Sequence, residues 1–385
     1  MVSSNWISQK TRQLRKEEQN LKDRQVFEAG YTPPEIYMRE ELEPIQKNLV
    51  RFSEYRSPEH LVIYGPRGAG KTTCLRTLCR DLTQHTKGRV KVIYVNARSG
   101  TESSYKLYQE ITGNLTKGMD TGALRRRAGE ILDDNTIIII DEVDNLRDTE
   151  ALYFIAQETN AEIIALTQRT YWFRDQLDSS IQSRMHPRQE YFPSYTSQQI
   201  YEIIKTRAAA GLHRWDNGQL HYIAALTVRD FQGDARIAIQ ALKYAGIADL
   251  WTEESITEAM ATANQHVEGD AIKHLPDREL LILSVLAQQP ESPKAYRLFV
   301  QRDDYIRSVT QRTWQRSIDS LVNAGLVSKT ATRIGRSTSI IAEPLMHNNA
   351  LIVQEIRRRD LSFIIEPSSP KGQDLIREAS LTSSP

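Results

Sequence analysis

The segment GPRGAGKT, at Gly65–Thr72, constrains the fold of this chain more than any other part of it. It fits the pattern G-x-x-x-x-G-K-[ST] and lies between an apolar run, LVIY, and a helix-like stretch, TTCLRTLCRDL. A strand, a glycine-rich loop and a helix in this order form a phosphate-binding loop (P-loop), because the glycines let backbone N–H groups wrap around phosphate oxygens. We therefore expect a nucleotide-binding α/β domain.

Two side chains of the P-loop have predicted roles in binding ATP or ADP. Lys71 is expected to reach the β- and γ-phosphates, and the Thr72 hydroxyl is expected to ligate Mg²⁺. The start of the following helix adds a favourable dipole for an anion. The predicted cofactor-binding residues of this segment are Gly65, Gly68, Ala69, Gly70, Lys71, Thr72 and Thr73.

A second motif, IIIIDEVD at Ile137–Asp144, supplies the other half of this site. Four isoleucines predict a buried central strand, and Asp141 follows at its carboxyl end, where open α/β sheets bind ligands. We expect Asp141 to hold Mg²⁺ and Glu142 to orient the attacking water. Seven acidic residues and one basic residue lie between Asp133 and Glu150, so this edge of the sheet is strongly negative.

The remaining β-prone and helical runs predict the domain organisation. Strands expected at 61–64, 90–96, 136–141, 162–167 and 189–192 alternate with helices, which indicates a parallel sheet covered on both faces. Four helical patterns follow without strands, and then three helices and a β-hairpin typical of a winged helix-turn-helix. The predicted parts are an N-terminal basic arm (1–26), a P-loop base domain (27–195), a helical lid (196–270), a winged helix (275–345) and a partly disordered tail (346–385).

Composition excludes several classes of protein. Lysine plus arginine is 50 and aspartate plus glutamate is 49, so the chain is neither a histone-like polycation nor an acidic tail protein. Two cysteines cannot form a disulfide framework or a structural zinc site. The chain has neither an apolar signal-peptide core nor a run long enough to span a bilayer, so we expect a cytoplasmic, nucleoid-associated protein without a membrane partner. The basic arm is open to two interpretations, a solvated tail or a nucleic-acid-binding arm.

Local charge points to duplex DNA as a partner. Six basic residues and one acidic residue, Asp319, lie between Tyr305 and Ile341, on the predicted third helix and the hairpin. A recognition helix presents such side chains to base edges and phosphates, whereas a winged helix used for protein contact is the alternative. Trp314 is expected in the core rather than on DNA. The predicted DNA-binding residues are Gln311, Arg312, Gln315, Arg316, Arg333 and Arg336.

The segment GDARIAIQAL from Gly233, together with the spacing of the other motifs, resembles the lid of AAA+ ATPases. Within them, residues 27–345 resemble the archaeal origin-recognition initiators, relatives of the eukaryotic origin recognition complex and its helicase-loading partner. The resemblance implies an AAA+ fold and slow ATP hydrolysis. It also implies binding to a replication origin, recruitment of the replicative helicase and contacts with other initiator copies.

The same resemblance implies roles for residues outside the P-loop. Arg236 of GDAR would touch the γ-phosphate from the lid, and Arg184, which ends LDSSIQSR, would act as an arginine finger on a neighbouring subunit. Tyr195 and Arg207 fall where the family has nucleotide-contacting residues. The predicted catalytic set is therefore Glu142, Lys71, Arg236 and Arg184.

The chain departs from the family pattern after its fourth predicted strand. The family usually has an Asn there that senses the γ-phosphate, whereas this chain reads ALTQRTYWFRDQLD. Thr167, Gln168 or Arg169 must replace that Asn, or sensing is weakened, so nucleotide binding is better supported than turnover. The alternative functions are an ATP-switched winged-helix regulator, or a mobile-element AAA+ protein that does not act at origins. A third alternative, a metabolic kinase, would need a small-molecule pocket, for which the sequence gives no signal, and the predicted winged helix argues against it.

Overall fold

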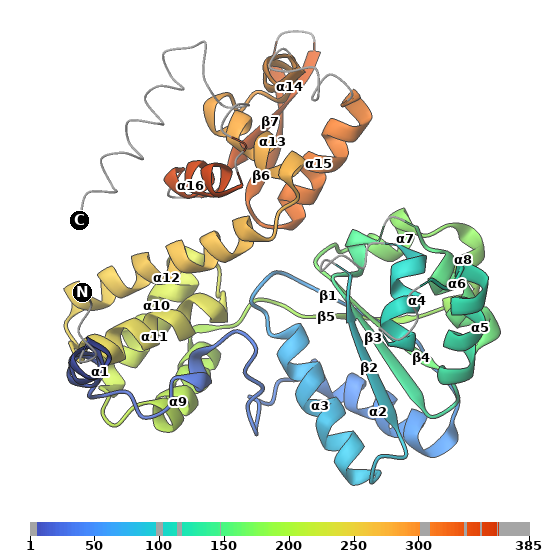
Figure 1. Cartoon of the computed structure of the whole chain (residues 1–385), viewed down its shortest axis with the longest axis horizontal. Helices are drawn as coiled ribbons and strands as arrows, with labels where there is room; N and C mark the ends of the chain where they lie inside the picture. The colour runs from blue at the N-terminus through green and yellow to red at the C-terminus, as the bar shows by residue number, and fades with distance from the viewer. Residues whose placement is uncertain are drawn as a thin grey trace. The chain divides into compact units, whose positions relative to one another are not determined.

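Five parallel strands form one sheet in the order β2-β3-β4-β1-β5 (Figure 1). The computed structural model describes residues 6–97, 103–113, 118–146, 148–300, 309–334, 337–346, 349–359 and 361. The strands lie where the sequence predicts them, within one residue at each end. They are β1 (Leu61–Tyr64), β2 (Lys91–Asn96), β3 (Thr136–Asp141), β4 (Glu162–Thr167) and β5 (Arg188–Tyr191).

Strand β3 shows why these runs are almost continuously apolar. Ile137 and Ile139 belong to one buried cluster, and Ile138 and Ile140 belong to another. Successive side chains of a strand point to opposite faces, so both faces of the sheet are covered, as predicted for a parallel α/β sheet. One face carries α2 (Leu42–Tyr55) and α3 (Lys71–His85) (Figure 1). The other carries α4 (Ser104–Thr112), α5 (Thr121–Ile131), α6 (Glu150–Glu158), α7 (Trp172–Gln176) and α8 (Ser179–Met185).

Four helices follow the sheet, as predicted. They are α9 (Ser197–Gly211), α10 (Asn217–Phe231), α11 (Ala235–Ala248) and α12 (Glu253–Lys273). Contacts divide the chain into two units, Met1–Met260 and Ala261–Pro385. Helix α12 runs through this boundary without a break, so no linker separates the predicted lid from the C-terminal part.

The N-terminal segment differs most from the sequence-based expectation. The described side chains of helix α1 (Trp6–Glu17) are exposed. The next residues, however, are firmly attached to the lid. The Asn20 amide donates to the carbonyls of Arg214 (2.9 Å) and Gly246 (3.1 Å), and its oxygen accepts from the Arg214 N–H at 2.7 Å. A buried polar side chain with all these partners fixes the path of the backbone.

The short helix η1 (Gln25–Phe27) continues this attachment. Val26 and Phe27 are almost fully buried, and Gln240 of α11 donates to the Phe27 carbonyl at 2.7 Å. A Cβ at Gly211 would lie 2.5 Å from the Phe27 ring, so α9 needs glycine there. Residues 20–28 are therefore part of the lid's packing, which places Phe27 on the lid rather than on the base domain.

The second unit contains helices and a hairpin in the order predicted for a winged helix. They are α13 (Asp277–Gln288), α14 (Ser292–Val300), α15 (Gln311–Asn323), β6 (Val327–Ile334), β7 (Ser337–Pro344) and α16 (Ala350–Arg358). Strands β6 and β7 pair antiparallel. Trp314 is buried and donates its indole N–H to the Ser292 hydroxyl at 3.0 Å. This confirms the expectation that Trp314 belongs to the core.

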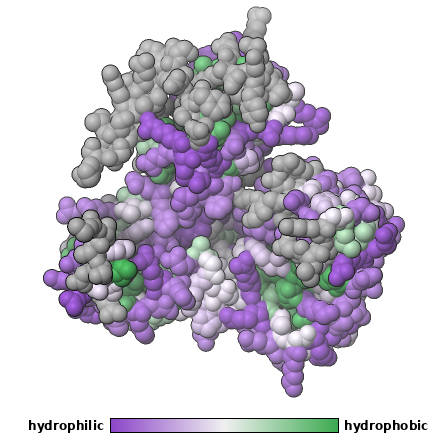
Figure 2. All heavy atoms as spheres, in the orientation of Figure 1, coloured by the Kyte–Doolittle hydropathy of each residue, from purple (hydrophilic) through white to green (hydrophobic). Residues whose placement is uncertain are grey.

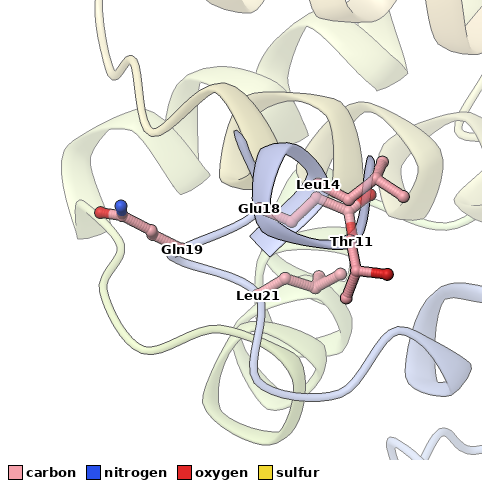
Figure 3. A pocket seen from close by; sticks show the side chains of 5 residues that line it. All are labelled: Thr11, Leu14, Glu18, Gln19 and Leu21. Atoms are coloured by element: carbon pink, nitrogen blue, oxygen red, sulfur yellow. The ribbon is translucent and has the colours of Figure 1, made fainter. Parts of the chain in front are cut away.

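Two surface features complete the description. No helix among the described residues is long and apolar enough to cross a membrane. The face seen in Figure 2 is mostly hydrophilic, with small separate hydrophobic areas. A pocket of about 470 Å³ lies beside α1 and is lined by Thr11, Leu14, Glu18, Gln19 and Leu21 (Figure 3). All five residues come from the N-terminal segment, and none of them is a predicted site residue.

Two ionisable groups are buried at the amino ends of the central strands, opposite the predicted nucleotide site. The His60 ring nitrogen Nδ1 accepts from the Ile163 N–H at 3.1 Å, and burial lowers the pKa of His60 to about 4. Burial raises the pKa of Glu162 to about 9. At neutral pH both groups are therefore uncharged in the folded chain, whereas Glu162 ionises in the unfolded chain.

The first prediction concerns Glu162. Since its pKa is raised on folding, the folded chain holds a proton that the unfolded chain releases, and the unfolding free energy falls as pH rises from about 4.5 to about 9. Glu162→Gln is expected to stabilise the base domain by at least about 1 kcal/mol near pH 8 and by much less near pH 5. Urea unfolding at both pH values checks this, with the exposed Glu54→Gln as control. An equal gain at both pH values would contradict the assignment.

Candidate nucleotide-binding site

The P-loop connects β1 to α3 and places Lys71 at the first position of that helix. Gly70 adopts a left-handed conformation (φ 82°), which glycine reaches without strain. The Lys71 ammonium donates to the carbonyls of Gly65 (2.6 Å) and Pro66 (2.7 Å). Burial lowers the pKa of Lys71 to about 8, and Asp141 and Asp144 partly oppose this shift. A largely desolvated cation is thus held over the loop, where it would bind phosphate strongly.

Asp141, at the end of β3, is held by three donors. Its Oδ2 accepts from the Thr72 hydroxyl at 2.7 Å and from the Tyr94 hydroxyl of β2, and its Oδ1 accepts from the Glu142 N–H at 2.9 Å. The Arg76 guanidinium lies 3.9 Å from the centre of the Tyr94 ring. A hydroxyl and a carboxylate side by side are oxygen ligands suited to Mg²⁺, so the donor set fits this ion.

Glu142 has an unusual backbone conformation. Its φ of 52° and ψ of 41° lie in the left-handed region, which is uncommon for a residue with a side chain. Asn145 donates its side-chain N–H to the Glu142 carbonyl (3.1 Å) and, more weakly, to the Glu142 carboxylate (3.4 Å). A strained backbone conformation of this kind persists where the surrounding contacts fix the direction of a side chain. It fixes Glu142 immediately beside Asp141.

The strand β5 leads into the lid through residues that touch the P-loop. Tyr195 is buried, and a Cβ at Gly70 would lie 2.0 Å from its hydroxyl oxygen. Arg39, from the segment before α2, donates to the carbonyls of Ala69 (3.2 Å) and Pro193 (3.0 Å). Its guanidinium also pairs with Glu41 at 2.8 Å and lies 4.7 Å from the centre of the Tyr195 ring. Arg39 therefore joins the P-loop to the connection between sheet and lid.

Arg236 reaches the same region from the amino end of α11. Its guanidinium pairs with Asp234, with Nε donating to Oδ1 at 2.9 Å. Burial opposes ionisation of Asp234, but the charge of Arg236 and its hydrogen bonds to the carboxylate, with a contribution from Arg67, together outweigh burial, so the pKa of Asp234 is lowered. The charges of Lys71 and Glu142 also interact with that of Arg236. The predicted lid arginine and the P-loop lysine thus lie close enough to interact.

The departure after β4 has a definite geometry. The Thr167 hydroxyl donates to Asp144 at 2.8 Å and accepts from the Arg169 N–H at 3.0 Å. A hydroxyl therefore lies at the strand end where the family pattern has an amide. This hydroxyl already donates to the Asp144 carboxylate, and the negative charge of that carboxylate disfavours a direct contact between the hydroxyl and a phosphate.

The other predicted site residues are placed as follows. Thr73 lies in the first turn of α3. Arg184 is exposed near the end of α8. Arg207 differs from the expectation of nucleotide contact, because its buried guanidinium donates to the Val26 carbonyl at 2.5 Å and lies 4.4 Å from the centre of the Tyr31 ring. In this structure it fastens the N-terminal segment to α9.

The predicted DNA-binding residues of α15 share one end of that helix. Gln311, Arg312 and Arg316 are exposed, and Gln315 is half-buried. On the opposite side, Ile318 and Leu321 pack into the core of the second unit. Arg336 and the side chain of Arg333 lie outside the described residues, as do residues 362–385 of the predicted tail.

Sequence reasoning missed Arg39, Tyr94 and Asp234. Tyr94 could have been found, since it lies near the carboxyl end of a strand next to β3. Arg39 sits in a charged stretch, MREELE, and nothing local marks its side chain as almost fully buried. Asp234 was part of a recognised motif, but its contact with the P-loop comes from the folding of the lid against the base domain.

Several known proteins are similar to this chain in sequence and fold. A model described as "AAA domain" matches residues 55–170. The ORC1-type DNA replication protein 2 of Haloarcula marismortui is 28% identical over 73% of this chain and 76% of that protein. The ORC1-type DNA replication protein of Thermococcus onnurineus is 26% identical over 83% of this chain and 87% of that protein. The chain is similar to archaeal ORC1-type DNA replication proteins over most of its length. The fold is also that of the Aeropyrum pernix ORC1 protein, solved in complex with DNA, with a TM-score of 0.69 and 24% identity over 89% of this chain and 98% of that one.

The second prediction tests the role of Lys71 in nucleotide binding. Lys71→Ala is expected to weaken ATP and ADP binding by about tenfold to a hundredfold, because a charge-assisted hydrogen bond is removed from a desolvated site. Equilibrium titration of the full chain with each nucleotide measures this. Lys91→Ala, at the far end of the sheet and paired with Asp133, is a matched control. Unchanged nucleotide affinity in Lys71→Ala, with an unchanged melting temperature, would contradict the assignment of Lys71 to phosphate binding.

Proposed function

We propose that this chain is an ATP-dependent initiator of DNA replication that binds duplex origin DNA and helps to recruit the replicative helicase. The observation that carries the proposal is the combination, in one chain, of a P-loop site reached by a lid arginine and a C-terminal helix with exposed basic residues. The relatives' description as ORC1-type DNA replication proteins supports it.

The nucleotide site accounts for binding and for slow hydrolysis. Lys71 and the backbone of Gly65–Thr72 would hold the phosphates of ATP or ADP. Thr72 and Asp141 would hold Mg²⁺, which supplies charge neutralisation when bound. Glu142 would orient and polarise the attacking water, since it projects from a constrained backbone beside Asp141. The Thr167 hydroxyl is engaged by Asp144, which supports slow turnover.

The third prediction separates binding from turnover. Glu142→Gln is expected to retain ATP affinity while phosphate release falls by about a hundredfold or more, because the amide cannot accept a proton from water. Single-turnover phosphate release and equilibrium ATP binding are measured on the same preparations. Glu130→Gln, an exposed change on α5, is the control. Equal phosphate release from Glu142→Gln and wild type would show that another group positions the water.

Duplex DNA is the proposed second ligand. Arg312 and Arg316 lie one helical turn apart on α15, and both are exposed. Residues four apart on a helix share a face, so the two guanidinium groups present a single basic surface. Asp319 is the acidic residue on this helix, and Lys329 neutralises it at 2.7 Å. The surface therefore suits phosphates or base edges in a major groove.

The fourth prediction tests this surface. The variant Arg312→Ala/Arg316→Ala is expected to bind DNA more weakly and with a smaller dependence of log K on log salt, by about 0.9 for each phosphate that the variant no longer neutralises. Arg278→Ala/Arg357→Ala removes two exposed arginines from other helices of the same unit and is the charge-matched control. An unaltered salt slope in the first variant would count against α15 as the DNA-binding helix.

The initiator proposal itself depends on sequence preference. The protein should bind double-stranded DNA from the replication origin of its own replicon more tightly than scrambled DNA of equal length at physiological salt. Equal affinity would reject origin recognition and favour the ATP-switched regulator. The exposed Arg184 further suggests an arginine finger for a neighbouring initiator copy, and a nucleoid-associated cytoplasmic location follows from the DNA ligand.

A further inference from the structure

The turn before α11 packs directly on the P-loop. A Cβ at Gly68 would lie 2.0 Å from Asp234 Oδ1 and 2.8 Å from the Asp234 Cα. The Ala235 N–H points to the Gly68 carbonyl at 3.4 Å. The Asp234 side chain is only 14% exposed. An acidic group of the lid thus touches the loop that is proposed to bind phosphates.

Asp234 also holds the guanidinium of Arg236. Nε of Arg236 donates to both carboxylate oxygens (2.9 and 3.2 Å), and Nη2 donates to Oδ2. This bidentate geometry is the one that a guanidinium uses for a carboxylate or a phosphate. The Arg236 side chain remains 40% exposed, so it can exchange one partner for another.

We propose that Asp234 is an internal competitor of the γ-phosphate for Arg236, and that it sets how strongly the lid distinguishes ATP from ADP. The inference rests on the nucleotide-binding function proposed above. When Arg236 engages a γ-phosphate, it must give up part of its pairing with Asp234. ADP offers no γ-phosphate, so the pair stays closed. The preference for ATP is thereby reduced by the free energy of opening the pair.

A substitution at Asp234 can remove the charge alone. The Asp234 carboxylate accepts from the Arg236 N–H at 2.9 Å and so caps α11. Asparagine caps helices as well as aspartate does, and serine is nearly equal. Asp234→Asn and Asp234→Ser therefore keep the cap and eliminate the ion pair, so the folded lid is retained in both variants.

The experiment measures the affinity of the full chain for ADP and for a non-hydrolysable ATP analogue. Asp234→Asn is expected to raise the ratio of analogue affinity to ADP affinity about fivefold or more, the lower end of typical coupling between sites. In an Arg236→Ala background, the same substitution should leave the ratio unchanged. Asp230→Asn, which breaks the exposed Arg229–Asp230 pair of the same lid, is the matched control.

The outcomes separate the two proposals. Wild-type protein that binds neither nucleotide would reject the nucleotide-binding function and this inference together. Wild-type binding with an unchanged ratio in Asp234→Asn and Asp234→Ser would overturn only the inference. An equal gain in affinity for ADP and for the analogue would mean that the Asp234 charge only repels the phosphates near the loop and does not compete for Arg236. Selective weakening of the analogue would show that Asp234 positions Arg236 instead of competing for it.

Discussion

The close approach of lid and connecting residues to the backbone of the P-loop is the constraint on which the rest of the nucleotide site depends. Tyr195 lies against Gly70, and Asp234 lies against Gly68. A side chain at either glycine would push these residues away from the loop. The glycines of this loop therefore do more than leave N–H groups open to a phosphate, because they also let residues of the lid and of its connection to the sheet pack on the loop. Arg39 secures the arrangement by binding the carbonyls of Ala69 and Pro193.

Patterns within short stretches of sequence predicted the sheet well. The isoleucines of β3 are buried on alternate faces, which is what a strand covered on both sides requires. The pairing of Thr72 with Asp141 also follows from local rules, because the P-loop and the end of β3 meet at the carboxyl edge of the sheet. The buried strand and the Thr72–Asp141 pair depend only on residue types and on the order of the elements, so both could be predicted from the sequence.

Long-range packing of polar residues escaped prediction. Asn20 is almost fully buried by partners that lie 194 and 226 residues away in the chain. Arg207 was assigned to the nucleotide by resemblance, yet its burial against Val26 arises from the same N-terminal attachment. Composition gives no sign of such contacts, because a polar segment that packs on the lid has the same kind of composition as a segment exposed to solvent. Only the fold brings its partners together.

If the chain binds ATP as proposed, the departure after β4 would give the lid a larger share of nucleotide sensing. Thr167 donates to Asp144, so the strand end that faces the site presents a satisfied hydroxyl and a carboxylate. A γ-phosphate would gain little there, and the lid cation that we propose responds to it is Arg236, which is held by Asp234 beside Gly68. Discrimination between ATP and ADP would then depend on two competing anions around one guanidinium. Since a ligand shifts an equilibrium only by its difference in affinity for the two states, the strength of the Asp234–Arg236 pair would limit how far ATP can change the lid.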